Sequence, residues 1–197
     1  MKRIGALIAS LAVCLVHAQA VVGQPAPAFT LRDVNGGTVS LADYRGRTVV
    51  LEWHNFGCPF VQKHYGAGNM QALQRKYAND VVWLTVNSTS TASRDHVEPA
   101  QVASRLKEFN AAPARYLVDD PGTVGRAYGA KTTPHMFIVD SKGTVVYNGA
   151  IDDRRSADPA DIPRAKNYVA AALDEIKAGK PVSVASTTPY GCSVHYN

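Results

Sequence analysis

The sequence has 197 residues, of which 46% are hydrophobic and 19% charged, and its formal net charge is +5. This length predicts one domain with room for a substantial core, and the composition favours a folded soluble protein over a disordered one. The positive excess is small and dispersed, and no basic run with interleaved aromatic residues is present. We therefore expect no nucleic-acid partner.

Residues 1–20 have the three parts of a secretory signal peptide. Lys2 and Arg3 form a positive start, the apolar run 4–16 is too short to span a bilayer, and the last three residues, Ala-Gln-Ala, form a small-x-small cleavage site. We expect cleavage after Ala20 and export to a bacterial periplasm, with no stable membrane insertion of the mature chain. Cleavage lowers the net charge from +5 to +3, because Lys2 and Arg3 are the only charged residues of this segment.

Export leaves two of the three cysteines in the mature chain. Cys14 lies in the predicted signal peptide, whereas Cys58 and Cys192 remain. In an oxidising compartment two cysteines can form a persistent disulfide. A structural disulfide is therefore the simplest hypothesis, against which a redox role has to be weighed.

The first half of the mature chain shows hairpin and strand patterns followed by a helix pattern. Apolar and polar residues alternate on either side of Asn35-Gly36-Gly37, which predicts a β-hairpin. The β-branched run 48–53 predicts a buried strand. Apolar residues then recur mostly at helical spacing over 61–77, and Gly66 and Gly68 predict a kink within that helix.

The second half is predicted to contain further elements in the order strand 81–86, helix 99–109, strand 116–118, helical turn 124–128, hairpin 136–147 and helix 165–176. Gly179 and Pro181 close the last helix. This order of strands and helices predicts an α/β fold with a central mixed sheet flanked by helices. We expect residues 21–180 to form this domain and residues 181–197 to form an irregular C-terminal tail.

Cys58 lies at a predicted strand-to-helix junction and is followed by Pro59. Proline suits the first helical position, where its missing N–H costs nothing. Unpaired N–H groups and the positive end of the dipole at a helix N-terminus stabilise a thiolate. His54, Lys63 and His64 lie nearby in sequence, and we expect them to tune the thiolate by adding positive charge. These features favour a nucleophilic Cys58 over an inert buried thiol or half of a structural bridge.

The surroundings of this cysteine resemble the active-site region of the thioredoxin superfamily. Residues 58–61 (Cys-Pro-Phe-Val) take the place of the C-x-x-C motif, and Thr133-Pro134 resembles the cis-proline loop of that fold. The leader 27–51 resembles the N-terminal extension of the peroxiredoxin-like redoxin branch, the AhpC/TSA type. The resemblance covers residues 23–179, and it implies a thioredoxin-like fold with an N-terminal β-hairpin extension.

The resemblance also implies an activity and a substrate groove. In this fold the cis-proline loop offers backbone groups to an extended substrate chain beside the active-site cysteine. Thr133, Pro134 and Pro59 are then expected to contact substrate, with the bond before Pro134 in the cis form. The implied activity is thiol–disulfide oxidoreduction without a cofactor. The implied partners are protein thiols or disulfides, or a partner reductase.

The sequence departs from the motifs of the family, and these departures restrict which activity the resemblance implies. Peroxiredoxins carry a Pro-x-x-x-Thr-x-x-Cys motif, and counting back from Cys58 its Pro and Thr positions hold Leu51 and Asn55. The peroxidatic cysteine of that family generally aligns with Val61. The sequence therefore resembles a peroxiredoxin-like group that keeps a single active-site cysteine, and weak thiol peroxidase activity is a further alternative.

Thiol–disulfide exchange needs a second thiol that releases the mixed disulfide. Val61 cannot supply it, so Cys192 is the remaining candidate in the mature chain. We hypothesise that the tail folds back so that Cys58 attacks and Cys192 resolves. The alternative, which the sequence leaves open, is a permanent Cys58–Cys192 bridge that ties down the tail. The sequence favours no particular oligomeric state.

A metal site is the competing interpretation. Cys58, Cys192, His195 and His135 are its candidate ligands, and Cys192-x-x-His195 has the spacing of a ligand pair. Sulfur together with imidazole suits Cu(I) or Zn(II). The thioredoxin-fold copper chaperones of cytochrome oxidase assembly use two cysteines and a histidine, although their cysteines are close in sequence. Copper or zinc binding is therefore the alternative function.

Overall fold

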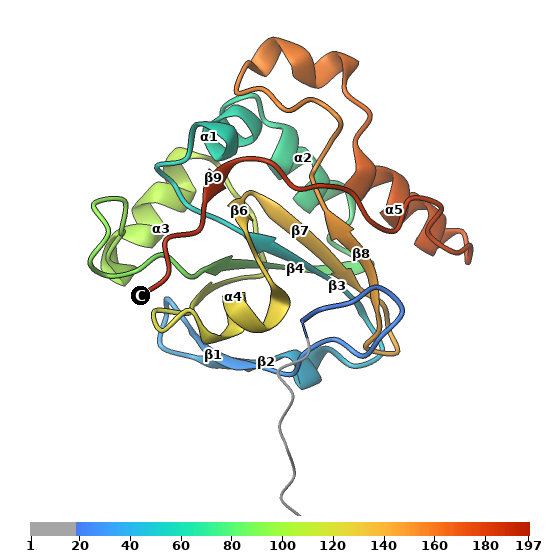
Figure 1. Cartoon of the computed structure of the whole chain (residues 1–197), viewed down its shortest axis with the longest axis horizontal. Coiled ribbons are helices and arrows are strands. Elements are labelled where there is room, and N and C mark those ends of the chain that lie inside the picture. Colours follow the sequence, from blue (N-terminus) through green and yellow to red (C-terminus); the bar gives the residue numbers. More distant parts are fainter. Residues whose placement is uncertain (1–18) are drawn as a thin grey trace, which may run out of the picture.

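The computed structural model describes residues 19–197, which fold around a mixed β-sheet (Figure 1). The predicted signal peptide lies almost wholly in residues 1–18, outside the described residues. Within the described part, the main sheet has seven strands in the order β2-β1-β5-β4-β3-β7-β8, and a second sheet pairs β6 with β9. In the same part, no helix has both the length and the apolar character needed to cross a bilayer.

The strands are β1 (Thr30–Asp33), β2 (Thr38–Ser40), β3 (Thr48–Trp53), β4 (Val81–Asn87), β5 (Arg115–Val118), β6 (Thr132–Thr133), β7 (His135–Val139), β8 (Val145–Gly149) and β9 (Cys192–Ser193). The α-helices are α1 (Pro59–Gly66), α2 (Asn69–Lys76), α3 (Pro99–Glu108), α4 (Thr123–Tyr128) and α5 (Tyr168–Lys177). Short 3-10 helices span Leu41–Tyr44 and Pro159–Arg164.

Strand β3 lies in the interior of the sheet, between its parallel neighbour β4 and its antiparallel neighbour β7. Successive side chains of a strand point to opposite faces. Val50 therefore joins one buried cluster, with residues of α1, α2 and α5, whereas Val49 and Leu51 join another, with residues of α4 and the N-terminal segment. Because helices cover both faces (Figure 1), the strand reads as one continuous apolar run.

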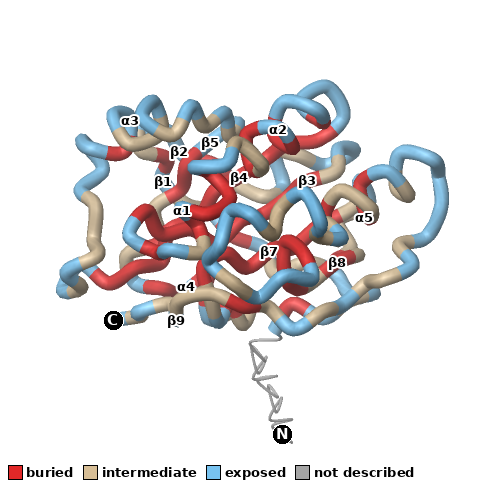
Figure 2. Tube along the Cα trace, turned by 90° about the horizontal axis from the view of Figure 1, so that it is seen from above, coloured by how far each residue is buried: buried red, intermediate tan, exposed pale blue. Residues whose placement is uncertain are grey.

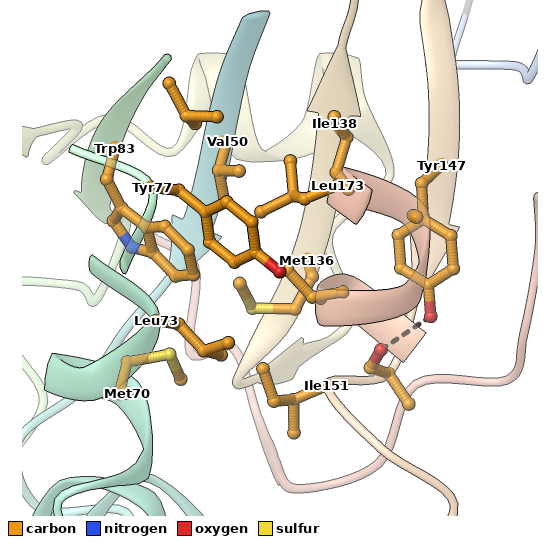
Figure 3. Packing of buried hydrophobic residues seen from close by; sticks show 14 of the residues in the cluster. Val50, Met70, Leu73, Tyr77, Trp83, Met136, Ile138, Tyr147, Ile151 and Leu173 are labelled. Carbon is orange, nitrogen blue, oxygen red and sulfur yellow. Dashed lines mark hydrogen bonds between the residues drawn. The ribbon is translucent and has the colours of Figure 1, made fainter. Parts of the chain in front are cut away.

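The core between the sheet and the helices α2 and α5 is closely packed, as Figure 3 shows. Val50, Met136 and Ile138 come from neighbouring strands and lie in one cluster with Met70 of α2. The Tyr147 hydroxyl, buried at the edge of this cluster, donates a hydrogen bond to Ala150 O at 2.6 Å. Along the chain the buried stretches follow the strands, whereas α3 and the connecting loops are more exposed (Figure 2).

The predicted fold class is confirmed, and the differences are local. The helix predicted over 61–77 is divided into α1 and α2, because Gly68 adopts a left-handed conformation with φ 73°. The last helix starts at Tyr168, later than predicted, because the side chain of Asn167 caps it. The tail, predicted to be irregular, contributes the short strand β9.

Met70 tests this packing, because its side chain is 0% exposed. We expect Met70→Ala to leave a cavity and to lower the free energy of unfolding by about 2–5 kcal/mol. Arg75→Ala, at an exposed position of the same helix, is expected to change it by less than about 0.5 kcal/mol. Urea denaturation of both variants and the parent measures the difference. Equal losses in the two variants would contradict the burial of α2 against the sheet.

Candidate active site

Cys58 lies at the N-terminus of α1, after the loop that follows β3. It is the N-cap residue, with φ −75° and ψ 122°, and Pro59 takes the first helical position. Its carbonyl accepts a hydrogen bond from Gln62 N at 2.9 Å, so the helix begins directly after the thiol. The side chain is 3% exposed. The structure thus places Cys58 at the strand-to-helix junction that the sequence predicts.

The loop before β7 reaches the same sulfur. The peptide bond between Thr133 and Pro134 is cis, as the resemblance implies. The Cys58 thiol donates a hydrogen bond to Thr133 O at 2.9 Å. The Thr133 hydroxyl is buried and has no hydrogen-bond partner among the described residues. It is therefore the backbone of Thr133 that contacts the thiol.

The C-terminal tail crosses this site (Figure 1). Its strand β9 pairs antiparallel with β6, so that Cys192 lies opposite Thr133. This pairing places Cys192 Sγ 2.7 Å from Cys58 Sγ, and both cysteines are free thiols. The sulfur–sulfur bond of a disulfide measures about 2.05 Å, so an oxidant that removes two electrons and two protons could join this pair with little movement of the two sulfur atoms. The tail therefore brings the two cysteines of the predicted mature chain together.

The ionisation of the two thiols is linked. Burial, the hydrogen bond with Cys58 and the negative charge that Cys58 carries when ionised raise the pKa of the Cys192 thiol to about 12. At this separation a negative charge on the Cys58 sulfur opposes the loss of the proton from Cys192. Cys192 therefore keeps its proton in the dithiol form.

The side chains predicted to tune the thiolate contact other groups. His54 is fully buried, and its Nδ1 lies 3.2 Å from Glu52 Oε1. The buried ammonium of Lys63 donates to Arg154 O at 3.0 Å. His64 belongs to a pocket that holds the tail. Within the described part of the chain, the hydrogen bonds of these three side chains therefore go to groups other than the Cys58 sulfur.

Sequence reasoning missed Glu52, a carboxylate that is 0% exposed on β3. Its oxygens accept hydrogen bonds from the Tyr65 hydroxyl at 3.0 Å and from Trp83 Nε1 at 2.8 Å. Buried carboxylates need such partners, because an unpaired charge is costly in the interior. The available signal is a glutamate inside an apolar, β-branched strand shortly before Cys58. Glu52 ties β3 and β4 to α1, the helix that begins directly after Cys58.

Tyr190, which precedes Cys192 by two positions, was also missed, and it fixes the tail against α1. Its side chain is 6% exposed, and its ring meets the Phe60 ring edge-on with centroids 5.8 Å apart. Its hydroxyl donates to Asp152 Oδ1 and lies 3.3 Å from Nε2 of His64. Burial lowers the pKa of His64 to about 4, so this ring is neutral. We call Phe60, His64 and Asp152 the tyrosine pocket.

The histidines of the metal-binding alternative are engaged elsewhere or exposed. His135 is buried, its Nδ1 accepts from Lys131 N at 3.2 Å, and its Nε2 lies 2.8 Å from Asn148 Oδ1. His195 is exposed, and its carbonyl accepts from Ser90 N at 2.6 Å. Among the residues that the structure describes, no three His, Cys, Asp or Glu side chains are grouped so as to hold a metal ion. The geometry assembles no ligand set for this alternative.

Comparison with known proteins identifies the family. The family model described as AhpC/TSA matches residues 22–148, which include Cys58 and the cis-proline loop. The chain belongs to the AhpC/TSA family. This AhpC/TSA chain is 28% identical over 123 residues to the thioredoxin-like protein YneN of Bacillus subtilis, covering 62% of this chain and 68% of that protein.

A second relative is the thiol-disulfide oxidoreductase ResA of Bacillus thuringiensis, which is 25% identical over 128 residues, 64% of this AhpC/TSA chain and 67% of ResA. A solved structure of an uncharacterised conserved protein from Geobacillus kaustophilus has a TM-score of 0.76 and 27% identity, and it covers 91% of this chain and 94% of its own. The family match ends before the tail, so it does not include Cys192.

His135 makes stability depend on pH. Burial and the nearby charge of Lys131 lower its pKa from 6.5 to about 4, against the opposing hydrogen bond to Asn148. Between about pH 6.5 and about pH 4, His135 therefore binds a proton in the unfolded chain but not in the folded chain. The free energy of unfolding falls as the pH falls through this window. The loss is on the order of 3 kcal/mol.

His135→Gln removes this titration, so its stability should fall less over the same window. Urea denaturation at neutral pH and near pH 4 compares the variant with the parent. The same decrease in both proteins would contradict the role of His135.

Proposed function

We propose that the chain is an exported thiol–disulfide oxidoreductase in which Cys58 is the nucleophile and Cys192 the resolving thiol. The observation that carries the proposal is the 2.7 Å separation of the two sulfur atoms at the N-terminus of α1. The name of its relative ResA, a thiol-disulfide oxidoreductase, supports the class of reaction. The signal-peptide pattern of residues 1–20 supports export to a periplasm.

The proposed cycle begins with the dithiol form. The Cys58 thiolate attacks one sulfur of a substrate disulfide, forms a mixed disulfide and releases the other substrate sulfur as a thiolate. Cys192 then gives up its proton and attacks the Cys58 sulfur, so that the second substrate sulfur leaves and a Cys58–Cys192 disulfide forms. The substrate has gained two electrons and two protons. A partner reductase with a dithiol restores the protein, and the same steps run in reverse oxidise a substrate dithiol.

The electrostatics of the pair support this order of events. In the dithiol form, the negative charge of the ionised Cys58 is one cause of the raised pKa of Cys192. Once Cys58 is bound in a mixed disulfide, its sulfur carries no charge, and that cause disappears. Cys192 then ionises more readily, at the step where it is needed as a nucleophile.

The backbone around the nucleophile supports the proposed substrate contacts. Thr133 O lies 2.9 Å from the Cys58 sulfur, and the peptide bond between Thr133 and Pro134 is cis. Pro59 is exposed beside the thiol at the start of α1. We propose that Thr133, Pro134 and Pro59 line the groove in which the substrate chain lies.

Oxidised glutathione tests the two cysteine roles in the full chain, with Cys14→Ser in every protein so that only Cys58 and Cys192 are counted. The parent should end with a Cys58–Cys192 disulfide, no bound glutathione and two glutathione thiols released per chain. Cys192→Ser should keep one glutathione on Cys58 and release one thiol, because no second sulfur can resolve it. Cys58→Ser should react more slowly, because burial still raises the pKa of the Cys192 thiol and this thiol does not lie at a helix N-terminus. Intact mass and thiol titration measure these products.

The structural alternative predicts a different result. If a Cys58–Cys192 disulfide forms but a dithiol reductant does not reduce it in the folded protein, the disulfide is structural. The redox proposal would then fail. Preferential labelling of Cys192 in place of Cys58 would reverse the assignment of the two roles.

A further inference from the structure

The tail lies in the site as an extended strand held by its backbone. Cys192 pairs with Thr133, and Val194 N donates to Lys131 O at 3.1 Å. These contacts use main-chain groups that every extended segment carries. Strand addition to an exposed edge is a common way in which proteins bind peptides, with side-chain pockets supplying the specificity. The edge of β6 can therefore accept another chain in place of the tail.

The position before the cysteine is restricted to glycine. Gly191 has φ +140°, a conformation that residues with a side chain rarely adopt. A Cβ at this position would lie 2.1 Å from Thr133 O, the carbonyl that also accepts the Cys58 hydrogen bond. A segment that follows the path of the tail must therefore carry glycine immediately before its cysteine.

The tyrosine pocket selects the residue that lies two positions before the cysteine. Phe60 supplies an apolar wall, and Asp152 Oδ1 accepts the hydrogen bond of the Tyr190 hydroxyl. Asp152 is 1% exposed, and its second oxygen, Oδ2, has no hydrogen-bond partner among the described residues. An aromatic ring without a hydroxyl group in this pocket would cover the carboxylate and leave Oδ1 without this hydrogen bond, which is costly. The pocket therefore favours an aromatic ring with a hydroxyl group.

We infer that the groove under the tail recognises an extended segment of a substrate protein with the sequence Tyr-Gly-Cys, whose cysteine forms the mixed disulfide with Cys58. This inference rests on the proposed oxidoreductase function and names its substrate. In the structure the groove holds residues 190–192 of the chain itself, and the substrate segment displaces them. The substrate segment then leaves the groove with its cysteine still bonded to Cys58, the tail returns, and Cys192 attacks the Cys58 sulfur and releases the substrate cysteine as a thiolate.

The upstream part of the tail keeps it close while it exchanges. Asn148 N donates to Ala185 O at 3.0 Å, and Thr187 N donates to Asn148 O at 3.1 Å, so this part is paired with β8. Residues 188–197 leave the groove when the hydrogen bonds of Tyr196 to Ala130 O and of Asn197 to Asp120 O break, and the pairing with β8 keeps them tethered beside it. A tethered competitor has a high effective concentration, so only a segment that fills the tyrosine pocket well can displace it.

Three nonapeptides test the inference on the full chain with Cys14→Ser and Cys192→Ser, in which Cys58 is the remaining cysteine. The first has the sequence of residues 187–195, the second replaces its tyrosine by alanine, and the third replaces its glycine by alanine. Each carries 2-nitro-5-thiobenzoate on its cysteine, which Cys58 displaces to form the peptide–protein disulfide. The released chromophore gives the rate, and intact mass identifies the adduct.

We expect the first peptide to react at least about tenfold faster than either of the others, because each replacement removes an anchor or introduces a clash. The protein's own tail competes equally with all three peptides and slows their reactions by the same factor. The ratio of their rates therefore measures how well each peptide fits the groove. Oxidised glutathione, which carries no tyrosine, is the control for the function. Equal rates for the three peptides with normal glutathionylation of Cys58 would overturn the inference and leave the proposed function intact. No reaction with any peptide or with glutathione would overturn both.

Discussion

The pairing of β9 with β6 is the constraint on which the candidate site depends. Cys58 and Cys192 are 134 residues apart in the sequence, and the tail holds them together through backbone hydrogen bonds. The register matters as much as the pairing. A slip of one residue would turn Cys192 to the opposite side of the strand and remove it from the nucleophile. The two residues of β9 are supported on both sides, because Tyr190 fixes the tail upstream and the Tyr196 hydroxyl donates to Ala130 O downstream.

The main sheet supplies the other half of the site. Strands β3 and β7 are antiparallel neighbours, and Trp53 at the end of β3 lies opposite His135 at the start of β7. The loop that follows β3 and the loop that precedes β7 therefore meet at the same edge of the sheet. One carries Cys58 and the other the cis bond before Pro134. This meeting follows from strand order, and β9 covers the junction.

Local structure can be predicted well from this sequence, whereas most long-range contacts cannot. Cys58 followed by Pro59 predicts the thiol at a helix start, because both residues act on their immediate neighbours. The tyrosine pocket brings Tyr190 to His64, which is 126 residues away in the sequence. This contact depends on the path of the tail, which cannot be predicted because the tail sequence has no periodic pattern. Closeness in sequence also misleads. His54 is near Cys58 in the chain, yet it hydrogen-bonds Glu52 within the core.

The location of the second thiol, at the far end of the chain from the first, has a thermodynamic consequence. A covalent bond between sulfur atoms that are 134 residues apart closes a very large loop. In the chain-entropy description, closing a loop of this size removes about 5 kcal/mol of conformational freedom from the unfolded ensemble. That amount is comparable with the whole stability of many single domains. In the proposed cycle, each formation and reduction of this bond would thus also alter how firmly the molecule resists unfolding and proteolysis, which would link its redox state to its lifetime.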